Sequence, residues 1–136
     1  MTYSTRKVAA VFIFKEGDKY LFQKRTHTGA CDGYYMLPGG HIEEGETVRE
    51  GGVRELYEEL GVTVDPQDLD LKLVIAAKSH IYFFFSVQKY TGTITNKEPE
   101  KHGDLSFLPL TEPDLYPSVS KELMAIESGV TFLEYK

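Results

Sequence analysis

A cluster of carboxylates late in the first half of the chain is the feature that most constrains its fold. Glu55, Glu58 and Glu59 lie three and four positions apart. On an α-helix these spacings place the three side chains on one face. Like charges so close repel one another, and a sequence that builds such a cluster usually has a cation to hold. Carboxylate oxygens are hard ligands that favour Mg²⁺ or Mn²⁺ over softer metals. The sequence therefore predicts a helix that carries a divalent-metal site.

Signals for both ends of this helix stand in the sequence. Thr47 followed by Glu50 predicts a capping box at the N-terminus, and Gly61 is placed to end the helix. We therefore expect a helix over residues 48–60.

Two consecutive glycines, Gly51 and Gly52, fall inside the expected helix. Each costs up to about 1 kcal/mol relative to alanine in a helix interior. Close packing of backbone on backbone would explain their presence.

The rest of the chain contains several runs rich in β-branched and aromatic residues. These runs predict strands at residues 7–14, 20–25, 35–40, 71–77, 80–90 and 105–108. The second strand is expected to pair with the first as a hairpin across the turn signal at residues 16–19. Within the run at 80–90, residues 81–87 are apolar apart from Ser86, which predicts a central strand buried on both faces.

The C-terminal part adds a second helix to these strands. Val119, Leu123 and Ile126 repeat at helical spacing, and Gly129 is expected to stop the helix. The predicted fold class is therefore α/β (α+β), with a mixed β-sheet and helices on both faces. A length of 136 residues predicts a single domain over residues 1–136.

Composition narrows the class of protein. Hydrophobic residues make up 41% and charged residues 26% of the chain, which is ordinary for a soluble globular protein. No apolar run approaches the roughly 20 residues of a membrane helix, and the apolar run at 8–14 is interpreted as a strand rather than a signal peptide. The single Cys31 excludes an internal disulfide and favours a reducing compartment, so the predicted location is cytoplasmic.

The net charge of −6 bears on the class of ligand. An extended nucleic-acid surface needs a basic stripe, which this balance argues against. A polyphosphate substrate would also be repelled, unless bound divalent metal reverses the local charge.

The residues around the carboxylates also match a known motif. Gly40, five residues, Glu46, seven residues, Arg54-Glu55-Leu56, one residue, Glu58-Glu59, one residue and Gly61-Val62 follow in order. This pattern resembles the full Nudix box, with all nine defining positions in place. The segment Asn96-Lys97-Glu98-Pro99-Glu100-Lys101 is similar to one found in MutT-like members of that family. The resemblance implies an α/β/α sandwich with a mixed sheet.

The resemblance further implies roles for individual residues. The metal ligands would be three glutamates of the helix and a carbonyl of the preceding turn: Glu55, Glu58, Glu59 and Gly39. Arg54 would orient the glutamates by ion pairing. A glutamate outside the box completes the site or acts as the general base in many members. Glu98 and Glu100 are both candidates, and at least one of them is expected to be a plain loop carboxylate.

Substrate contacts are predicted from side-chain chemistry. Tyr35 and Phe107 are candidates for stacking on a base, with a core position as the alternative. Arg25 ends a predicted strand and is a candidate for contact with phosphates, with a solvated surface charge as an equally good interpretation.

The predicted function is that of a Mg²⁺-dependent Nudix hydrolase, with Mn²⁺ as the alternative metal. The substrate would be a nucleoside diphosphate derivative, foremost a nucleoside triphosphate, oxidised or otherwise damaged, cleaved to a monophosphate and pyrophosphate. Alternatives are hydrolysis of ADP-ribose or of a dinucleoside polyphosphate, and a non-catalytic nucleotide-binding Nudix-like module. The expected partner is a small-molecule nucleotide, with no extended nucleic acid and no membrane; a homodimer is left open.

Overall fold

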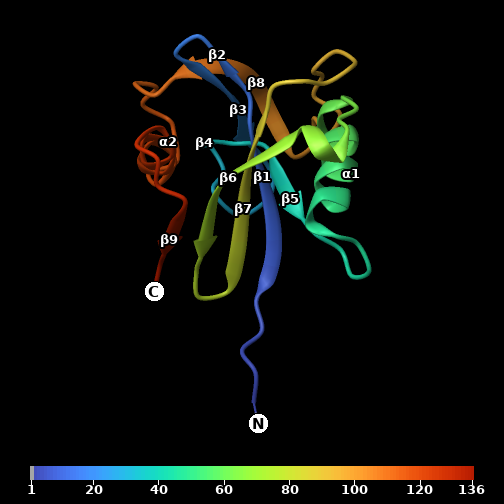
Figure 1. The fold of residues 1–136 in the computed structure, drawn as a ribbon. Helices are drawn as coiled ribbons and strands as arrows, with labels where there is room; N and C mark the ends of the chain where they lie inside the picture. The colour runs from blue at the N-terminus through green and yellow to red at the C-terminus, as the bar shows by residue number, and fades with distance from the viewer. Residues whose placement is uncertain (1) are drawn as a thin grey trace.

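The computed structural model describes residues 2–136, which form two β-sheets and two α-helices (Figure 1). The larger sheet has five strands in the order β5 (Gly39–His41), β1 (Lys7–Ile13), β7 (His80–Val87), β6 (Leu69–Ala76) and β9 (Phe132–Glu134). The β1–β7 and β6–β9 pairs are parallel and the other two pairs antiparallel. The sheet is therefore mixed, as predicted.

The smaller sheet is antiparallel and is built around β3 (Lys19–Arg25). Its other strands are β2 (Lys15–Glu16), β4 (Tyr35–Met36) and β8 (His102–Pro109). The predicted hairpin between residues 7–14 and 20–25 forms only at its tip. β2 pairs with β3 across the turn, and the carbonyl of Phe14 accepts from the amide of Leu21 at 3.0 Å, while β1 lies in the other sheet. The chain leaves the larger sheet after Ile13, so only the short β2 precedes the turn.

The predicted strand at 35–40 is also divided between the sheets. β4 pairs with β3, whereas β5 pairs with β1. Pro38 lies between them, and its carbonyl accepts a hydrogen bond from the amide of Phe12 at 2.8 Å. Proline has no amide hydrogen to donate to a ladder, which suits a position where the chain changes sheets.

The helices cover opposite faces of the larger sheet: α1 (Val48–Leu60) on one and α2 (Val119–Glu127) on the other (Figure 1). Successive side chains of a strand point to opposite faces. Phe12 of β1 and Phe85 of β7 accordingly pack in the core beneath α1, while their neighbours Ile13 and Phe84 pack in the core beneath α2. This arrangement confirms the sandwich and the central, doubly covered position of β7.

Element boundaries differ from the predictions mainly where pairing decides them. β6 begins at Leu69, directly after a short 3₁₀ turn at Pro66–Asp68, and β8 begins at His102 rather than at residue 105. β9 was not predicted, since three residues carry no readable period and this strand exists through its parallel pairing with β6.

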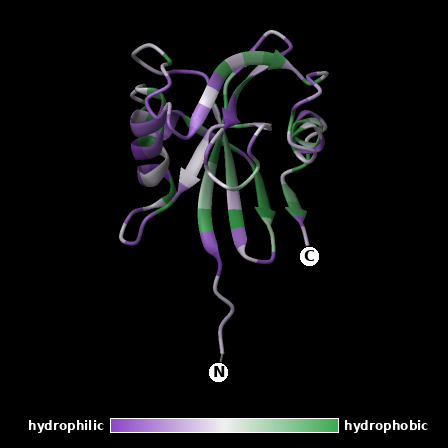
Figure 2. Ribbon diagram, turned by 180° about the vertical axis from the view of Figure 1, so that it is seen from behind, coloured by the Kyte–Doolittle hydropathy of each residue, from purple (hydrophilic) through white to green (hydrophobic). Residues whose placement is uncertain are grey.

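The hydropathy of the residues differs between the sheet and the helix α1. The central strands carry much of the apolar sequence, and α1 is largely polar (Figure 2). Among the described residues, no helix has the length and apolar character needed to cross a membrane.

Candidate active site

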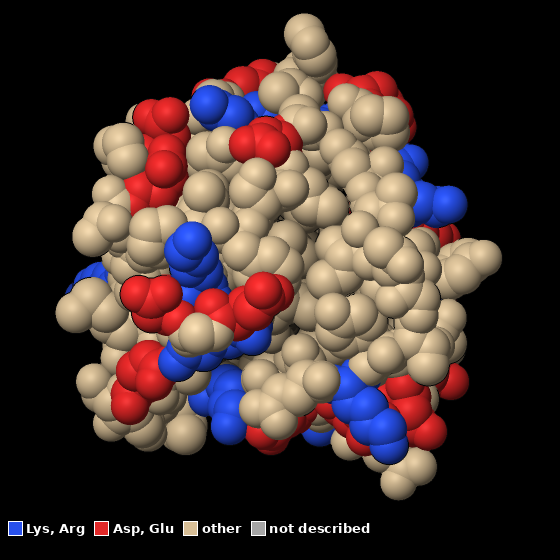
Figure 3. Space-filling model, turned by 90° about the horizontal axis from the view of Figure 1, so that it is seen from above, with Lys and Arg blue, Asp and Glu red and all other residues tan. Residues whose placement is uncertain are grey.

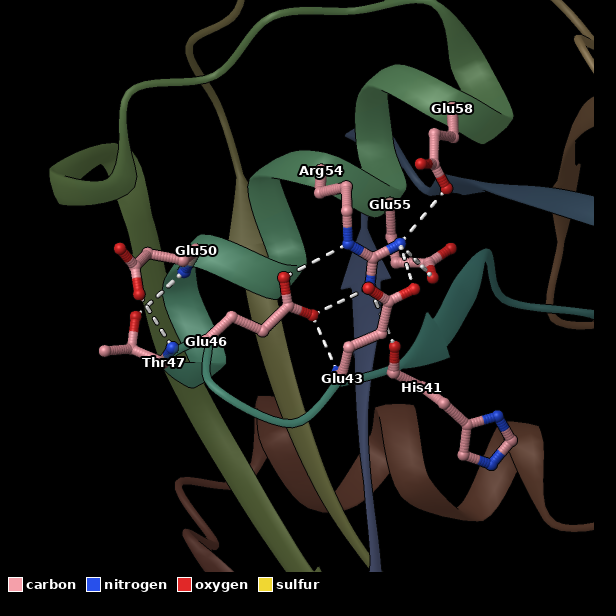
Figure 4. Close-up of polar contacts among 8 residues, drawn as sticks. All are labelled: His41, Glu43, Glu46, Thr47, Glu50, Arg54, Glu55 and Glu58. Atoms are coloured by element: carbon pink, nitrogen blue, oxygen red, sulfur yellow. Dashed lines mark hydrogen bonds and ion pairs between the residues drawn. The ribbon is translucent and has the colours of Figure 1, made fainter.

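The helix that carries the carboxylates has defined ends. The Oγ1 of Thr47 accepts from the amide of Glu50 at 3.1 Å, and the Glu50 carboxylate accepts from the amide of Thr47 at 2.8 Å (Figure 4). Gly61 follows the last turn with φ of 71°, a left-handed conformation that glycine adopts without a steric penalty. The predicted helix over residues 48–60 and its capping box are confirmed.

Arg54 is the centre of a polar network on this helix (Figure 4). Its Nε and Nη2 donate to the two carboxylate oxygens of Glu46 at 3.1 and 2.8 Å. Its Nη1 donates to Glu55 at 2.9 Å and to Glu58 at 3.1 Å, and Nη2 also reaches the carbonyl of His41 at 3.1 Å. The hydrogen bond from Arg54 lowers the pKa of Glu46. The guanidinium thus ties the helix carboxylates to β5 and to the loop that precedes α1.

Small residues give this network its space. A Cβ on Gly40 would lie 2.3 Å from the carboxyl carbon of Glu55, and a Cβ on Gly51 would lie 2.6 Å from Oε1 of Glu46. Gly52 faces side chains of the core, with the nearest atom 3.3 Å from a built Cβ. The atoms closest to the two helix glycines therefore belong to side chains. The expected packing of backbone against backbone is not found at these positions.

A second group of ligand atoms gathers around Glu59, whose side chain is buried. Glu59, Glu98 and His102 each offer a ligand atom, and these atoms lie within 4.8 Å of one another. Burial, followed by the charges of Glu55 and Glu98, raises the pKa of Glu59 to about 8. Burial lowers the pKa of His102. The Glu59 charge is thus strongly disfavoured unless a cation accompanies it.

The loop that carries Glu98 is attached to the end of α1. The amides of Thr95 and Lys97 donate to the carbonyls of Leu60 and Glu59 at 2.9 and 3.0 Å. These carbonyls belong to the last turn of the helix, where no intrahelical donor remains for them. The helix terminus therefore fixes the position of the loop.

Sequence reasoning missed His102 because the four histidines show no metal-ligand spacing. The available signal was the four-residue separation of Glu98 and His102, which brings side chains together only if the segment makes a turn. It does so here, since the amide of His102 donates to the carbonyl of Glu98 at 3.1 Å.

A cleft of about 500 Å³ connects the two groups of side chains. Its lining includes most of the predicted site residues, namely Arg25, Gly39, Arg54, Glu55, Glu58, Glu59 and Glu98. Glu58 is exposed at the surface end and Glu59 is buried, so the helix face spans the depth of the cleft.

Three predicted site residues lie elsewhere. Glu100 is an exposed loop residue. Tyr35 is buried in the core beneath α2, and its hydroxyl donates to Asp104, which raises the pKa of Tyr35 to about 12. Phe107 packs against the core beneath α1. Among the described residues that line the cleft, none of these three is found.

An apolar pocket of about 370 Å³ adjoins the cleft. The two share a wall of four residues, Val11, Met36, Leu37 and Tyr82. Glu122 of α2 lines the pocket with a side chain only 8% exposed, and one of its oxygens accepts from the hydroxyl of Tyr135 at 3.1 Å. A flat ring could therefore lie beside the carboxylate cleft, with Glu122 as a hydrogen-bond acceptor.

The donor set of the cleft fits a hard divalent cation. Carboxylate oxygens dominate it. Oε2 of Glu59 is buried and has no hydrogen-bond partner within residues 2–136, which is unusual for a carboxylate oxygen. The charges of the wider surface are mixed. On the face of the described residues shown in Figure 3, acidic and basic side chains lie in mixed groups around a broad uncharged area, without a continuous basic stripe.

Comparisons with known proteins agree with this architecture. The NUDIX domain family matches residues 4–125. The 8-oxo-dGTP diphosphatase of Escherichia coli K12 is 30% identical over 114 residues, which cover 82% of this chain and 88% of that protein. The human 8-oxo-dGDP phosphatase NUDT18 is 33% identical over 94 residues, which cover 68% of this chain but only 28% of that longer protein.

A solved structure shows the same fold. The crystal structure of a MutT NUDIX hydrolase from Burkholderia pseudomallei superposes with a TM-score of 0.76 at 22% identity, over 94% of this chain and 100% of that one. The family match over most of the sequence, together with the bacterial relative covered almost end to end, makes this chain a MutT-like member of the Nudix hydrolase family.

Proposed function

We propose that this Nudix hydrolase is a Mg²⁺-dependent nucleoside triphosphate pyrophosphohydrolase that releases a monophosphate and pyrophosphate. The main support for the proposal is that the cleft and the apolar pocket lie side by side and share a wall. A cleft rich in carboxylates suits a metal-bound polyphosphate, and the apolar pocket that shares its wall suits a base. A non-catalytic module has no need of the complete carboxylate set that lines this cleft.

The residues that would hold the metal are Glu55, Glu58, Glu59 and Glu98, with the carbonyl of Gly39 as a further ligand. When bound, the metal would offset the charge of the polyphosphate and lower the pKa of the attacking water.

Two arginines would support the metal ligands and the substrate. Arg54 holds Glu55 and Glu58 through one guanidinium nitrogen, which fixes both carboxylates toward the cleft. Arg25 lines the cleft and would contact the phosphates.

The adjoining pocket supports a purine as the base. Tyr82 and Tyr116 offer aromatic surface there, and the buried carboxyl of Glu122 would accept from ring and exocyclic N–H groups. Guanine presents such donors side by side. The names of the bacterial and human relatives, an 8-oxo-dGTP diphosphatase and an 8-oxo-dGDP phosphatase, point in the same direction, so an oxidised guanine nucleotide is the preferred substrate of this proposal.

A substrate panel tests the proposal. The purified protein would be incubated with normal and oxidised nucleoside triphosphates, ADP-ribose and dinucleoside polyphosphates, with EDTA or with Mg²⁺. We expect turnover of a triphosphate with Mg²⁺, none with EDTA, and pyrophosphate rather than phosphate as the product. Turnover confined to ADP-ribose or a dinucleoside polyphosphate would replace the proposed substrate, and activity in EDTA would exclude the metal role.

A further inference from the structure

Three buried polar atoms lie close to the inner end of the cleft without a hydrogen-bond partner inside the described part of the chain. They are Nε2 of Gln23, Oε2 of Glu59 and Nδ1 of His102. The three residues are 2%, 7% and 7% exposed, so bulk water does not satisfy these atoms. Buried polar groups are nearly always paired in folded proteins. Three unpaired atoms in one place therefore indicate that a bound ion or water completes their interactions.

Gln23 and His102 share a small cavity. It measures about 20 Å³ and is also lined by Gly39, on the floor of the cleft. A space of this size holds one water molecule. Such a water would accept from Nε2 of Gln23 and from a protonated Nδ1 of His102, and this tautomer leaves the lone pair of Nε2 free.

The Nε2 atom of His102 faces the carboxylates. It lies 4.0 Å from Oε1 of Glu59, too far for a good hydrogen bond. Two atoms bound to one ion at roughly 2.1 Å each are separated by up to about 4.2 Å, so this distance fits two ligands of a shared metal.

The backbone holds His102 in this place from both sides. Its amide donates to the carbonyl of Glu98, and its carbonyl accepts from the side chain of Asn96 at 2.6 Å. The imidazole of His102 and the carboxylate of Glu98 therefore project from one segment, whose backbone is held by these hydrogen bonds.

We propose that His102 is a metal ligand through Nε2, together with Glu59 and Glu98, and that this imidazole makes the site favour Mn²⁺ or Co²⁺ over Mg²⁺. The inference rests on the proposed function, which requires a divalent metal in the cleft. Imidazole nitrogen binds the later divalent metals better than Mg²⁺, which prefers oxygen ligands in octahedral geometry. Gln23, through the shared water, would position the ring.

The experiment measures metal binding without substrate. Mn²⁺, Co²⁺ and Mg²⁺ would be titrated by calorimetry into metal-free wild type, into His102→Gln and into the matched control His80→Gln, a histidine of the same cleft outside the Glu59 group. We expect His102→Gln to weaken Mn²⁺ and Co²⁺ binding by about 10–100-fold, with a change in Mg²⁺ affinity of less than about 3-fold. His80→Gln should leave all three affinities unchanged.

A spectroscopic measurement on the wild type does not depend on how the variant folds. In Co²⁺-loaded wild type labelled with ¹⁵N-histidine, we expect a paramagnetically shifted imidazole N–H signal that is absent from His102→Gln and present in His80→Gln. Absence of that signal from wild type, or equal losses for Mg²⁺ and Mn²⁺ in His102→Gln, would overturn the role of His102 while Mg²⁺-dependent hydrolysis stands. Metal binding through His102 in a protein that hydrolyses no nucleotide would instead overturn the proposed function alone.

Discussion

Glu58 and Glu59 are adjacent in sequence but occupy very different surroundings. Glu58 is exposed and paired with Arg54, whereas Glu59 is 7% exposed and lies beside Glu98 and His102. A carboxyl with a pKa raised by burial binds more protons in the folded state than in the unfolded state. The contribution of Glu59 to the free energy of unfolding of the metal-free protein therefore falls as pH rises from about 4.5 to about 8, the range between its unfolded and folded pKa values.

Glu59→Gln should accordingly separate stability from activity. At pH 7 and in EDTA, we expect the variant to be more stable than wild type by roughly 1–3 kcal/mol. The buried wild-type carboxyl has to be kept protonated at a pH above its unfolded-state pKa, and glutamine carries no such cost. Turnover should fall by at least about 100-fold, since a metal ligand is lost. Thermal unfolding at pH 5, 7 and 8.5, with parallel activity assays, measures both.

Glu58→Gln is the matched control. It should also lose activity, but it should gain no stability, because the Glu58 side chain is solvated. If Glu59→Gln is less stable than wild type at pH 7 in EDTA, the raised pKa of the buried Glu59 carboxyl is contradicted.

At the scale of the element, the sequence of α1 has a lower helix propensity than it could have, because some of its positions make room for side chains of the site. Glycines at two consecutive interior positions lower that propensity. Gly51 leaves room for the Glu46 carboxylate that clamps Arg54, and Gly40 of β5 leaves room for Glu55. The space between helix, loop and strand is thus shaped for charged side chains.

Gly51→Ala and Gly52→Ala test this interpretation as a pair. Both substitutions raise helix propensity by about the same amount. The new Cβ of Gly51→Ala would displace Glu46 from Arg54, so we expect its kcat/KM to fall by about 10-fold or more, while Gly52→Ala stays within about 3-fold of wild type. Equal activities in the two variants, with equal folding by circular dichroism, would show that the Glu46–Arg54 pair does not support turnover.

At the scale of the whole molecule, the site joins segments that are far apart in sequence. The carboxylates of α1 meet Glu98 because the loop before β8 caps the last carbonyls of the helix. The apolar pocket adds α2 and the C-terminal segment, through Glu122 and Tyr135. Only the packing of both helices on one sheet brings the cleft and the pocket to a common wall.

The loop before β8 offers a comparison between two glutamates two residues apart. Glu98→Gln should lower kcat by about 100-fold or more, because Glu98 lines the cleft beside Glu59. Glu100→Gln should leave kcat within about 2-fold, because this exposed side chain lies outside the cleft. Steady-state kinetics with saturating Mg²⁺ distinguishes them, and equal effects of the two substitutions would remove the loop from the site.

The sequence by itself determined the features that depend on local spacing. The helix over residues 48–60, its capping box, the shared face of Glu55, Glu58 and Glu59 and most strands follow from periodicity and turn chemistry, which act over a few residues. The match to the Nudix box likewise lies within one continuous segment.

Tertiary structure alone decided what depends on distant partners. It paired β3 with β8 rather than β1, buried Tyr35 and Phe107, separated Glu98 from Glu100 and brought His102 to Glu59. The physical reason is that strand pairing and burial are set by packing between remote segments, and no period along the chain records which segments will meet.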